Sequence, residues 1–451
     1  KIFVQEFFDL RHQLGEIVRR INMLEEERAK SPENNEMGHL TGRIRSLTDS
    51  FEDRCRELYD VTAEGSPNEV LEILEKQIIQ RHDINSPDVI RRLRQLLKLS
   101  DDWLSALGSP NANFAEFLAK SRTVVAGTLV GIGHRASGVV QNLYDWVIID
   151  EAGRAAPSEL AVAMQMGHRI LLVGDHKQLP PNFSQEVQDI IKEKYQANSE
   201  SSVFSSDFER VFDNSYGREV GSALRLQYRM APEIGDLVSK CFYEGKLNTG
   251  RQVPPDYYTL LPSNLEQQVN WIDMSVLGDQ GRESSSDNGA EKWNEAEARV
   301  VMSLLRKIIE SDEFIDSVKK DLQPGEPAIG VICMYGKQRA ILDRLKAEAS
   351  WLGDSRRLVK IDTVDSYQGK ENRIVILSTV RNNPFMNAGF LRSSNRVNVA
   401  LSRAMDKLFI VAPKNMWIGR NAELPLGKVL KEVELLAKNQ RASILSAKDL
   451  M

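Results

Sequence analysis

The first 60 residues carry two narrow apolar stripes with helical spacing. Apolar side chains recur at alternating intervals of three and four residues from Phe3 to Leu24, and a second stripe runs from Leu40 to Leu58. The polar stretch from Ser31 to Gly38, which contains a proline, separates them. The pattern predicts an antiparallel helical hairpin of the coiled-coil type.

Two further helix starts follow the hairpin. In both Ser66-Pro67 and Ser86-Pro87 a serine is placed to cap a helix that has proline at its first position. We therefore expect a helical module over residues 1–120. Apolar heptads usually mean packing, so a structural arm is the simpler interpretation, and a docking site for a protein partner is the alternative.

From Thr123 onward, short β-rich runs alternate with helical patterns, which is typical of parallel α/β sheets. The pattern predicts two α/β domains that meet near Asn214 to Gly221, with an irregular loop from Gly278 to Gly289. The expected organisation is a partial first α/β domain over 121–218, a second over 219–430, and a C-terminal helix or tail over 431–451. The predicted strands are Thr123–Val125, Trp146–Ile149, Ile170–Val173, Ala328–Cys333, Leu358–Ile361, Arg373–Leu377 and Leu408–Val411.

Composition narrows the class of protein. The 451 residues are 41% hydrophobic, which suffices for more than one core, and the formal net charge of -5 excludes a uniformly basic coat. Any nucleic-acid contact must then come from a local groove. Cys55, Cys241 and Cys333 stand far apart and form no metal or disulfide pattern. No apolar run reaches the ~20 residues needed to cross a bilayer, so we expect a soluble intracellular protein without a membrane partner.

Two predicted strands end in polar side chains suited to phosphate chemistry. Asp150 and Glu151 directly follow the run Val147–Ile149, and Asp175 and Gln178 follow the run Ile170–Val173. Ligands of open α/β sheets bind at the carboxyl ends of strands. There Asp150 could hold Mg²⁺, Glu151 could polarise a water molecule, and Gln178 could sense a terminal phosphate.

These segments resemble the motifs of superfamily 1B helicases, the branch that includes senataxin and the nonsense-mediated decay helicase. DEAG at 150–153 and GDHKQLPP at 174–181 resemble motifs II and III, and LQYRM at 226–230 resembles the QYRM element. Together the matching segments span about Thr123 to Pro413, in the family's order. The others are Thr128–Leu129 (motif Ic), Tyr335–Gln338 (motif IV), Thr363–Glu371 (motif V) and Arg396–Ala404 (motif VI).

The resemblance implies tandem RecA-like P-loop NTPase domains, ATP as nucleotide and Mg²⁺ as its metal ion. Arg229 and Arg403 match arginine fingers, which typically contribute about 10³–10⁵ in rate. Tyr228 would stack on the base and Glu371 would bond the ribose. The catalytic set is thus Glu151, Gln178, Arg229 and Arg403, and the nucleotide-binding set is Asp150, Asp175, Tyr228, Gly369 and Glu371.

The resemblance also implies a track for single-stranded DNA or RNA across both domains. Thr128 in the first domain and Thr363, Val364 and Ser366 in the second would contact phosphates, which position a strand without reading its sequence. Arg396 either joins this track or braces the motif VI loop. By analogy, translocation would run 5′ to 3′.

One family element is missing from these residues. A P-loop needs GxxxxGK followed by Ser or Thr, and no such string occurs. The simplest explanation is an N-terminal truncation, with the helical module inserted in the first domain of a longer protein. The expectation is a helicase motor core that is inactive as this chain. The alternative is a pseudo-helicase, a non-enzymatic scaffold that binds nucleic acid or a partner. A nuclease has little support, because no compact acidic cluster beyond Asp150 and Glu151 appears.

Overall fold

The computed structural model describes all residues except 1, 31–33, 63, 85, 109–113, 135–136, 141, 196–205 and 288. It divides into two compact units, Lys1–Leu143 and Tyr144–Met451, each of which is described by itself. No helix among the described residues is long and apolar enough to cross a membrane.

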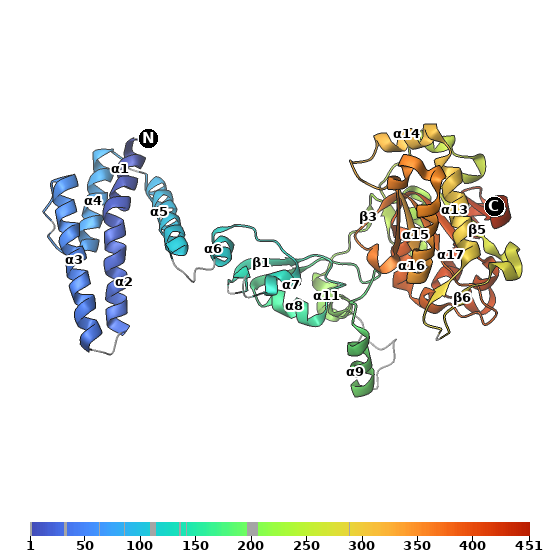
Figure 1. Cartoon of the computed structure of the whole chain (residues 1–451), viewed down its shortest axis with the longest axis horizontal. Helices are drawn as coiled ribbons and strands as arrows, with labels where there is room; N and C mark the ends of the chain where they lie inside the picture. Colours follow the sequence, from blue (N-terminus) through green and yellow to red (C-terminus); the bar gives the residue numbers. More distant parts are fainter. Residues whose placement is uncertain are drawn as a thin grey trace. The chain divides into compact units, whose positions relative to one another are not determined.

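The first unit contains the predicted hairpin (Figure 1). Residues 34–38, predicted to lie in the break between the stripes, are helical, and residues 31–33 lie outside the described part. Leu14 is fully buried, but Leu58 is 39% exposed and Cys55, three residues earlier, fills the core instead. The helices are α1 (Ile2–Leu10), a π-helical turn η1 (Arg11–Gly15), α2 (Glu16–Lys30) and α3 (Asn34–Tyr59).

A third helix completes this core. Helix α4 (Pro67–Arg81) begins at Ser66, whose side chain accepts a hydrogen bond from the Glu69 backbone in a capping box, as the sequence predicted. Its buried Leu71 and Leu74 join Phe7 and Leu14 in one cluster. Around Ile21 and Leu40, α2 and α3 pack only against each other in their apolar cluster. Around Leu14 and Phe51, residues of α4 join the cluster. The unit continues with α5 (Pro87–Gly108), α6 (Phe114–Ser121) and α7 (Leu129–Gly133).

The second unit starts with a two-stranded parallel sheet made of β1 (Tyr144–Ile149) and β2 (Gly167–Leu172). Both strands match their predictions. The predicted strand Thr123–Val125 is wrong: these residues form no strand, and Val124 is 81% exposed. A β-run becomes a strand only where another strand pairs with it. The helices after β1 are α8 (Pro157–Met164), α9 (Gln185–Tyr195), α10 (Asp207–Asp213) and α11 (Ser215–Val220).

The larger sheet of this unit has six parallel strands in the order β12-β5-β11-β10-β8-β9. Four strands match predicted runs, and β5 and β12 were missed. Residues assigned by the sequence to a C-terminal helix or tail form β12 at the sheet edge. The strands are β5 (Val269–Asp273), β8 (Ile329–Cys333), β9 (Val359–Thr363), β10 (Asn372–Ser378), β11 (Ala404–Ala412) and β12 (Ala442–Ser446).

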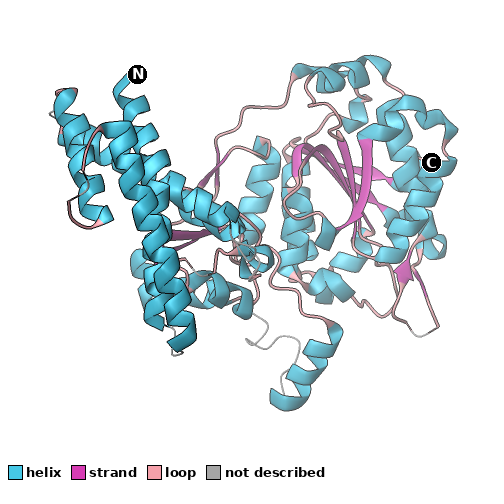
Figure 2. Cartoon of the chain, turned by 60° about the vertical axis from the view of Figure 1, so that its left-hand side comes forward, coloured by secondary structure: helices cyan, strands magenta, loops and turns pink. Residues whose placement is uncertain are grey.

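Helices cover both faces of this sheet (Figure 2). Alternate residues of β10 serve the two sides: Val375 and Leu377 join one apolar cluster, and Ile374 and Ile376 join the other. Burial on both faces explains the nearly continuous apolar runs that made these strands predictable. One cluster includes α12 (Pro232–Phe242), α16 (Ser394–Ser402) and α17 (Pro425–Lys438), and the other includes α13 (Glu295–Ile309), α14 (Asp312–Lys320) and α15 (Gly336–Glu348).

The segment from Gly278 to Gly289, predicted to be an irregular loop, is partly regular. A 3₁₀ segment, Met274–Gly281, ends in it, and Ser284–Ser285 pairs with Lys292–Trp293 as a small antiparallel ribbon. Turn-forming composition did not reveal this pairing, because a two-residue ribbon leaves no periodic signal.

Candidate functional site

The two acids after β1 are both exposed at the strand end, as the sequence predicted. The Asp150 carboxylate accepts a hydrogen bond of 2.9 Å from the Glu151 backbone N–H. Glu151 has a φ of 53°, a left-handed conformation that is uncommon outside glycine and is often found at functional sites. The two neighbouring carboxylates therefore have different partners: Asp150 accepts from the backbone of the turn, and Glu151 accepts from the Gln368 amide.

The loop after β2 is organised around Asp175. One carboxylate oxygen, Oδ1, accepts from the Lys177 backbone N–H at 2.9 Å. The other oxygen accepts from the Gln178 amide at 2.9 Å and from the Tyr243 hydroxyl at 2.6 Å. A carboxylate with this many donors is held firmly. Asp175, placed by resemblance in the nucleotide set, thus shapes the loop that carries Gln178.

Gly174, which precedes Asp175, permits a close approach between the ends of β1 and β2. A Cβ atom on Gly174 would lie 2.8 Å from the Gly153 backbone nitrogen. Real Cβ atoms do not approach backbone so closely, so the two strand-end loops can meet only with glycine here.

Within the second unit, the six-stranded sheet and its helices form what we call the second α/β part, and β1, β2 and their loops form the first. Side chains from the second part contact the loops after β1 and β2. The Arg403 guanidinium, at the end of α16, donates to the Gln178 amide oxygen at 3.0 Å. The Gln368 amide, within the motif V segment, donates to the Glu151 carboxylate at 3.2 Å. Arg154, just beyond Glu151, donates to the Asp365 carbonyl at 3.4 Å. The structure thus brings Glu151, Gln178 and Arg403 together.

Arg403 is almost fully enclosed, with 1% of its surface exposed. Burial and, next, the positive charge of Arg229 lower the pKa of Arg403 to about 10, and Glu151 and Glu371 act in the opposite direction. At neutral pH the guanidinium remains charged. Two arginines and two carboxylates therefore share one electrostatic environment, although their motifs are far apart in sequence.

Arg229 and Glu371 form an ion pair, with roughly two fifths of each side chain exposed. The resemblance gives these residues different tasks, one at the phosphates and one at the ribose. Tyr228 is 67% exposed and its ring lies over Gly250, where an added Cβ would sit 2.6 Å from the ring. Tyr228 is therefore a surface aromatic rather than a core residue. Gly369, with a φ of 77°, makes the turn that precedes Glu371.

The motif V residues predicted to contact a nucleic-acid strand lie at and just after the end of β9. The Thr363 hydroxyl donates to the Ser366 hydroxyl at 3.2 Å, and Thr363 is half-buried whereas Ser366 is exposed. Val364 is fully buried, so its predicted role cannot involve its side chain. Only its backbone remains for such a contact.

Arg396 braces motif V. Its guanidinium pairs with Asp365 at 3.3 Å and lies 4.7 Å from the centre of the Phe390 ring. Of the two roles considered from the sequence, this geometry supports bracing, although toward motif V rather than the motif VI loop alone. Thr128 belongs to the other unit, where its hydroxyl caps α7 by accepting from the Gly131 backbone at 3.0 Å.

Three residues at this site were not identified from the sequence. Asn395 and Asn398 on α16 donate to backbone carbonyls of the Asp175–Gln178 loop, at His176 (2.9 Å) and Lys177 (2.8 Å) respectively. Asn398 also donates to the Tyr243 hydroxyl at 2.9 Å. The spacing of the two asparagines on one helix was the only local signal, and Tyr243 carried none.

The residues present fit a Mg²⁺ ion that arrives with a nucleotide, but not an independent metal centre. No group of three or more His, Cys, Asp or Glu side chains in the described part could hold a metal ion. Mg²⁺ commonly takes only one or two protein carboxylates and fills its shell with phosphate oxygens and water. Asp150, exposed at a strand end, suits that single-ligand role.

Two family models match the chain, both described as AAA domains, over residues 9–185 and 203–415. The first match spans helical residues of the first unit as well as the Asp150 and Gln178 loops. The second spans the QYRM element and motifs IV, V and VI. Motifs, geometry and family matches now agree. The chain belongs to the superfamily 1B helicases.

Among curated superfamily members, the ATP-dependent helicase NAM7 of Saccharomyces cerevisiae is 32% identical over 328 residues, covering 71% of this chain. The DNA replication ATP-dependent helicase/nuclease DNA2 of Gallus gallus is 30% identical over 301 residues, covering 66%. The regulator of nonsense transcripts 1 homolog of Neurospora crassa is 29% identical over 300 residues, covering 65%. The matches span only 31%, 25% and 24% of these relatives.

The α/β fold expected from the resemblance, with tandem RecA-like domains and a helical N-terminal region, agrees with the structure and the family matches. The relatives named above include ATP-dependent helicases, which places the chain in a helicase and NTPase family, as the sequence predicted. The coiled-coil assignment and the missing P-loop stay predictions.

Proposed function

We propose that this chain is the motor core of an ATP-dependent helicase that moves along single-stranded DNA or RNA. The observation that carries the proposal is the meeting of hydrolysis residues from both α/β parts, through the Gln178–Arg403 and Glu151–Gln368 contacts. ATP with Mg²⁺ would supply the phosphoryl group that is transferred to water.

The side chains suit that transfer. Glu151 would accept a proton from the attacking water at its carboxylate, with Gln368 holding one of its oxygens. Arg403 and Arg229 would place positive charge where negative charge develops. In this structure Arg229 contacts Glu371 and Arg403 contacts Gln178, so nucleotide entry should exchange these contacts for contacts to phosphate and ribose.

The polar contacts across the two parts suggest how hydrolysis would become movement. Asn395, Asn398 and Tyr243 of the second part hold the Asp175–Gln178 loop of the first. A movement of Gln178 would therefore shift α16 directly. Helix α16 also carries Arg396, which pairs with Asp365 of motif V. This is a short mechanical path from the phosphate end of the site to the proposed strand track.

For the nucleic-acid strand we propose contacts at Thr363 and Ser366 of the second unit and, as a separate contact, at Thr128 of the first unit. Hydroxyl and backbone groups of this kind hold phosphates without sequence preference. Binding should therefore weaken with salt as counterions are released. A 5′ to 3′ polarity and the choice between DNA and RNA rest on analogy alone, and strand-specific assays decide both.

The sequence contains no GxxxxGK string followed by Ser or Thr, the pattern that forms a phosphate cradle. We infer that a segment of a longer protein supplies it, and an exposed sheet face supports this inference. Trp146, Ile148 and Leu171 line one face of the β1–β2 pair and are 53%, 65% and 45% exposed, whereas parallel sheets are normally covered on both faces. The covering layer would complete the first domain and hold the β-phosphate.

The decisive experiment measures phosphate release by the full-length gene product and by this chain, each with and without single strands. We expect strand-stimulated release by the full-length protein only. Glu151→Gln should lower that turnover by about 10²-fold or more while nucleotide still binds, because a positioned base contributes about that factor.

Absence of turnover in the full-length protein, together with salt-dependent strand binding, would favour the scaffold alternative. Robust turnover by this chain that Glu151→Gln abolishes would show that its own residues hold the phosphates. Unchanged turnover in full-length Glu151→Gln would remove Glu151 from the proton-accepting role.

A further inference from the structure

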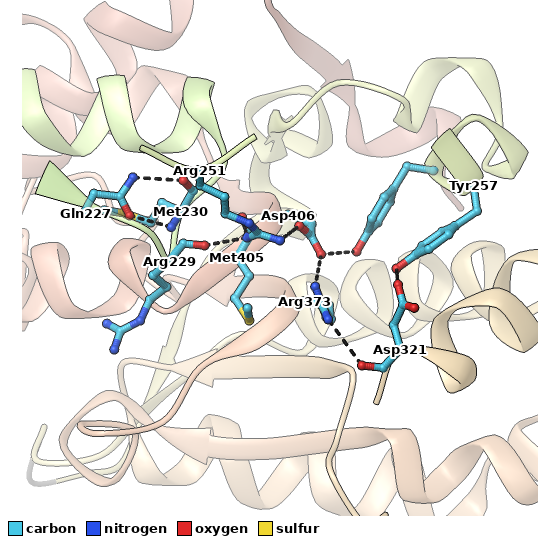
Figure 3. Close-up of polar contacts among 10 residues, drawn as sticks. Gln227, Arg229, Met230, Arg251, Tyr257, Asp321, Arg373, Met405 and Asp406 are labelled. Carbon is cyan, nitrogen blue, oxygen red and sulfur yellow. Dashed lines mark hydrogen bonds and ion pairs between the residues drawn. The ribbon is translucent and has the colours of Figure 1, made fainter. Parts of the chain in front are cut away.

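One half-buried arginine joins the two segments that carry the finger arginines (Figure 3). Arg251 follows β4 (Asn248–Thr249), and its guanidinium donates to the backbone carbonyl of Arg229. The same nitrogen donates to the backbone carbonyl of Met405 at 2.7 Å. Met405 lies two residues after Arg403, so a single guanidinium contacts the main chain of both finger segments.

The Arg251 side chain is itself held in place. Only 15% of it is exposed, and its second terminal nitrogen pairs with Asp406, whose side chain is fully buried. Asp406 also accepts from the Tyr258 hydroxyl at 2.9 Å and pairs with Arg373 at 3.5 Å. A planar guanidinium fixed by a buried carboxylate presents its remaining N–H groups in one direction.

Apolar packing and one backbone hydrogen bond also join the two finger segments: Met230 and Ala231 lie in the same buried cluster as Ala404. The QYRM element begins with β3 (Leu226–Gln227), which pairs only with the two-residue β4. The Ala231 backbone N–H donates to the Met405 carbonyl at 2.7 Å, the same oxygen that Arg251 contacts. Without Arg251, the polar contacts described between the two segments would be reduced to that hydrogen bond, beside the apolar packing of Met230 and Ala231 in the cluster that also holds Ala404.

We propose that Arg251 is a positioning residue that sets Arg229 and Arg403 at a fixed separation for the transition state. This inference rests on the proposed ATPase function. Arg251 acts through the backbone carbonyls of Arg229 and Met405, not through the side chains of the fingers. A wrong separation of Arg229 and Arg403 should reduce the rate of the chemical step more than the affinity for ATP.

Arg373 provides a matched control. It pairs with the same Asp406, is 20% exposed, and its other hydrogen bond goes to the Asp321 carbonyl at 3.3 Å, away from both finger segments. Arg251→Gln and Arg373→Gln each remove one cation from the buried carboxylate. Only Arg251→Gln also removes the hydrogen bonds to the backbone of the two finger segments.

The test has two arms. In this chain, hydrogen exchange at the Ala231 amide should accelerate about tenfold or more in Arg251→Gln and change little in Arg373→Gln. In the full-length protein, Arg251→Gln should lower kcat about 10-fold to 100-fold with KM nearly unchanged, because misplacing reacting groups by about 1 Å can cost about 10²-fold. Arg373→Gln should retain kcat.

If Arg251→Gln fails to fold, the pair Arg251→Gln/Asp406→Asn and Arg373→Gln/Asp406→Asn repeats the comparison without an unpaired buried acid. Equal effects at the two arginines, in exchange and in kcat, would show a purely structural network and overturn the proposal. A full-length protein without any ATPase would refute the proposed function, while the exchange arm would still decide whether Arg251 holds the finger segments.

Discussion

The Tyr243 hydroxyl gives the sharpest test of how the two α/β parts are joined. It donates to the Asp175 carboxylate at 2.6 Å and accepts from the Asn398 amide at 2.9 Å. Burial, together with the nearby negative charge of Asp175, raises the pKa of Tyr243 well above its ordinary value, so the donor proton stays in place at neutral pH. Tyr243→Phe removes both bonds and leaves the ring.

The magnitude follows from the charged bond. A hydrogen bond to an ionised group contributes about 1.5–3 kcal/mol, and a neutral one about 1 kcal/mol. Asp175 keeps its bonds from Lys177 and Gln178, and water can reach part of the site, so we expect a net loss of about 2 kcal/mol. Since about 1.4 kcal/mol is a factor of ten, the opening equilibrium of the Asp175–Gln178 loop should rise about 30-fold.

Hydrogen exchange at the backbone amides of Lys177 and Gln178 measures this opening directly. Tyr257→Phe is the matched control, because that hydroxyl also donates to a carboxylate, Asp321 at 2.9 Å, but away from the site. Exchange at residues 175–178 that stays within about twofold of the unsubstituted chain would refute the reasoning.

Two further predictions concern stability. Leu14→Asn, at a fully buried position, should destabilise the first unit by a few kcal/mol and leave the second folded, and a single shared loss of protection against hydrogen exchange in both units would contradict this. Burial raises the pKa of Glu297 to about 7, despite bonds from Ser378 and the Val380 backbone that oppose the rise. Because the pKa of Glu297 is higher in the folded than in the unfolded state, its protonation contributes to the free energy of unfolding. That contribution is complete below about pH 4.5 and is lost as pH rises through about 7. The unfolding free energy of the unsubstituted chain, from the slowest amides of β10, should therefore fall by about 2–3 kcal/mol relative to Glu297→Gln between pH 5 and 7.5, and a constant difference would refute it.

The sequence by itself determined the chemistry and most of the local structure. Strands buried on both faces leave continuous apolar runs, so β8, β10 and β11 were predictable. Serine followed by proline marked the start of α4, because the side-chain cap is a local interaction. Asp150 and Glu151 were identifiable because they directly follow the apolar run that ends β1, Gln178 because it lies in the loop after β2, and motif order supplied Arg229 and Arg403.

Tertiary structure alone decided what those residues contact. The edge strand β12 and its neighbour β5 were missed, and Thr123–Val125 forms no strand, because pairing depends on a distant partner rather than on composition. The contacts of Arg251 with Met405 and Asp406 cross more than 150 positions of the chain, and no local pattern encodes them. The sequence specifies the chemical type of a side chain, but its partners are set by how separate segments pack, and here that packing joins the backbones of two finger segments through one guanidinium, that of Arg251.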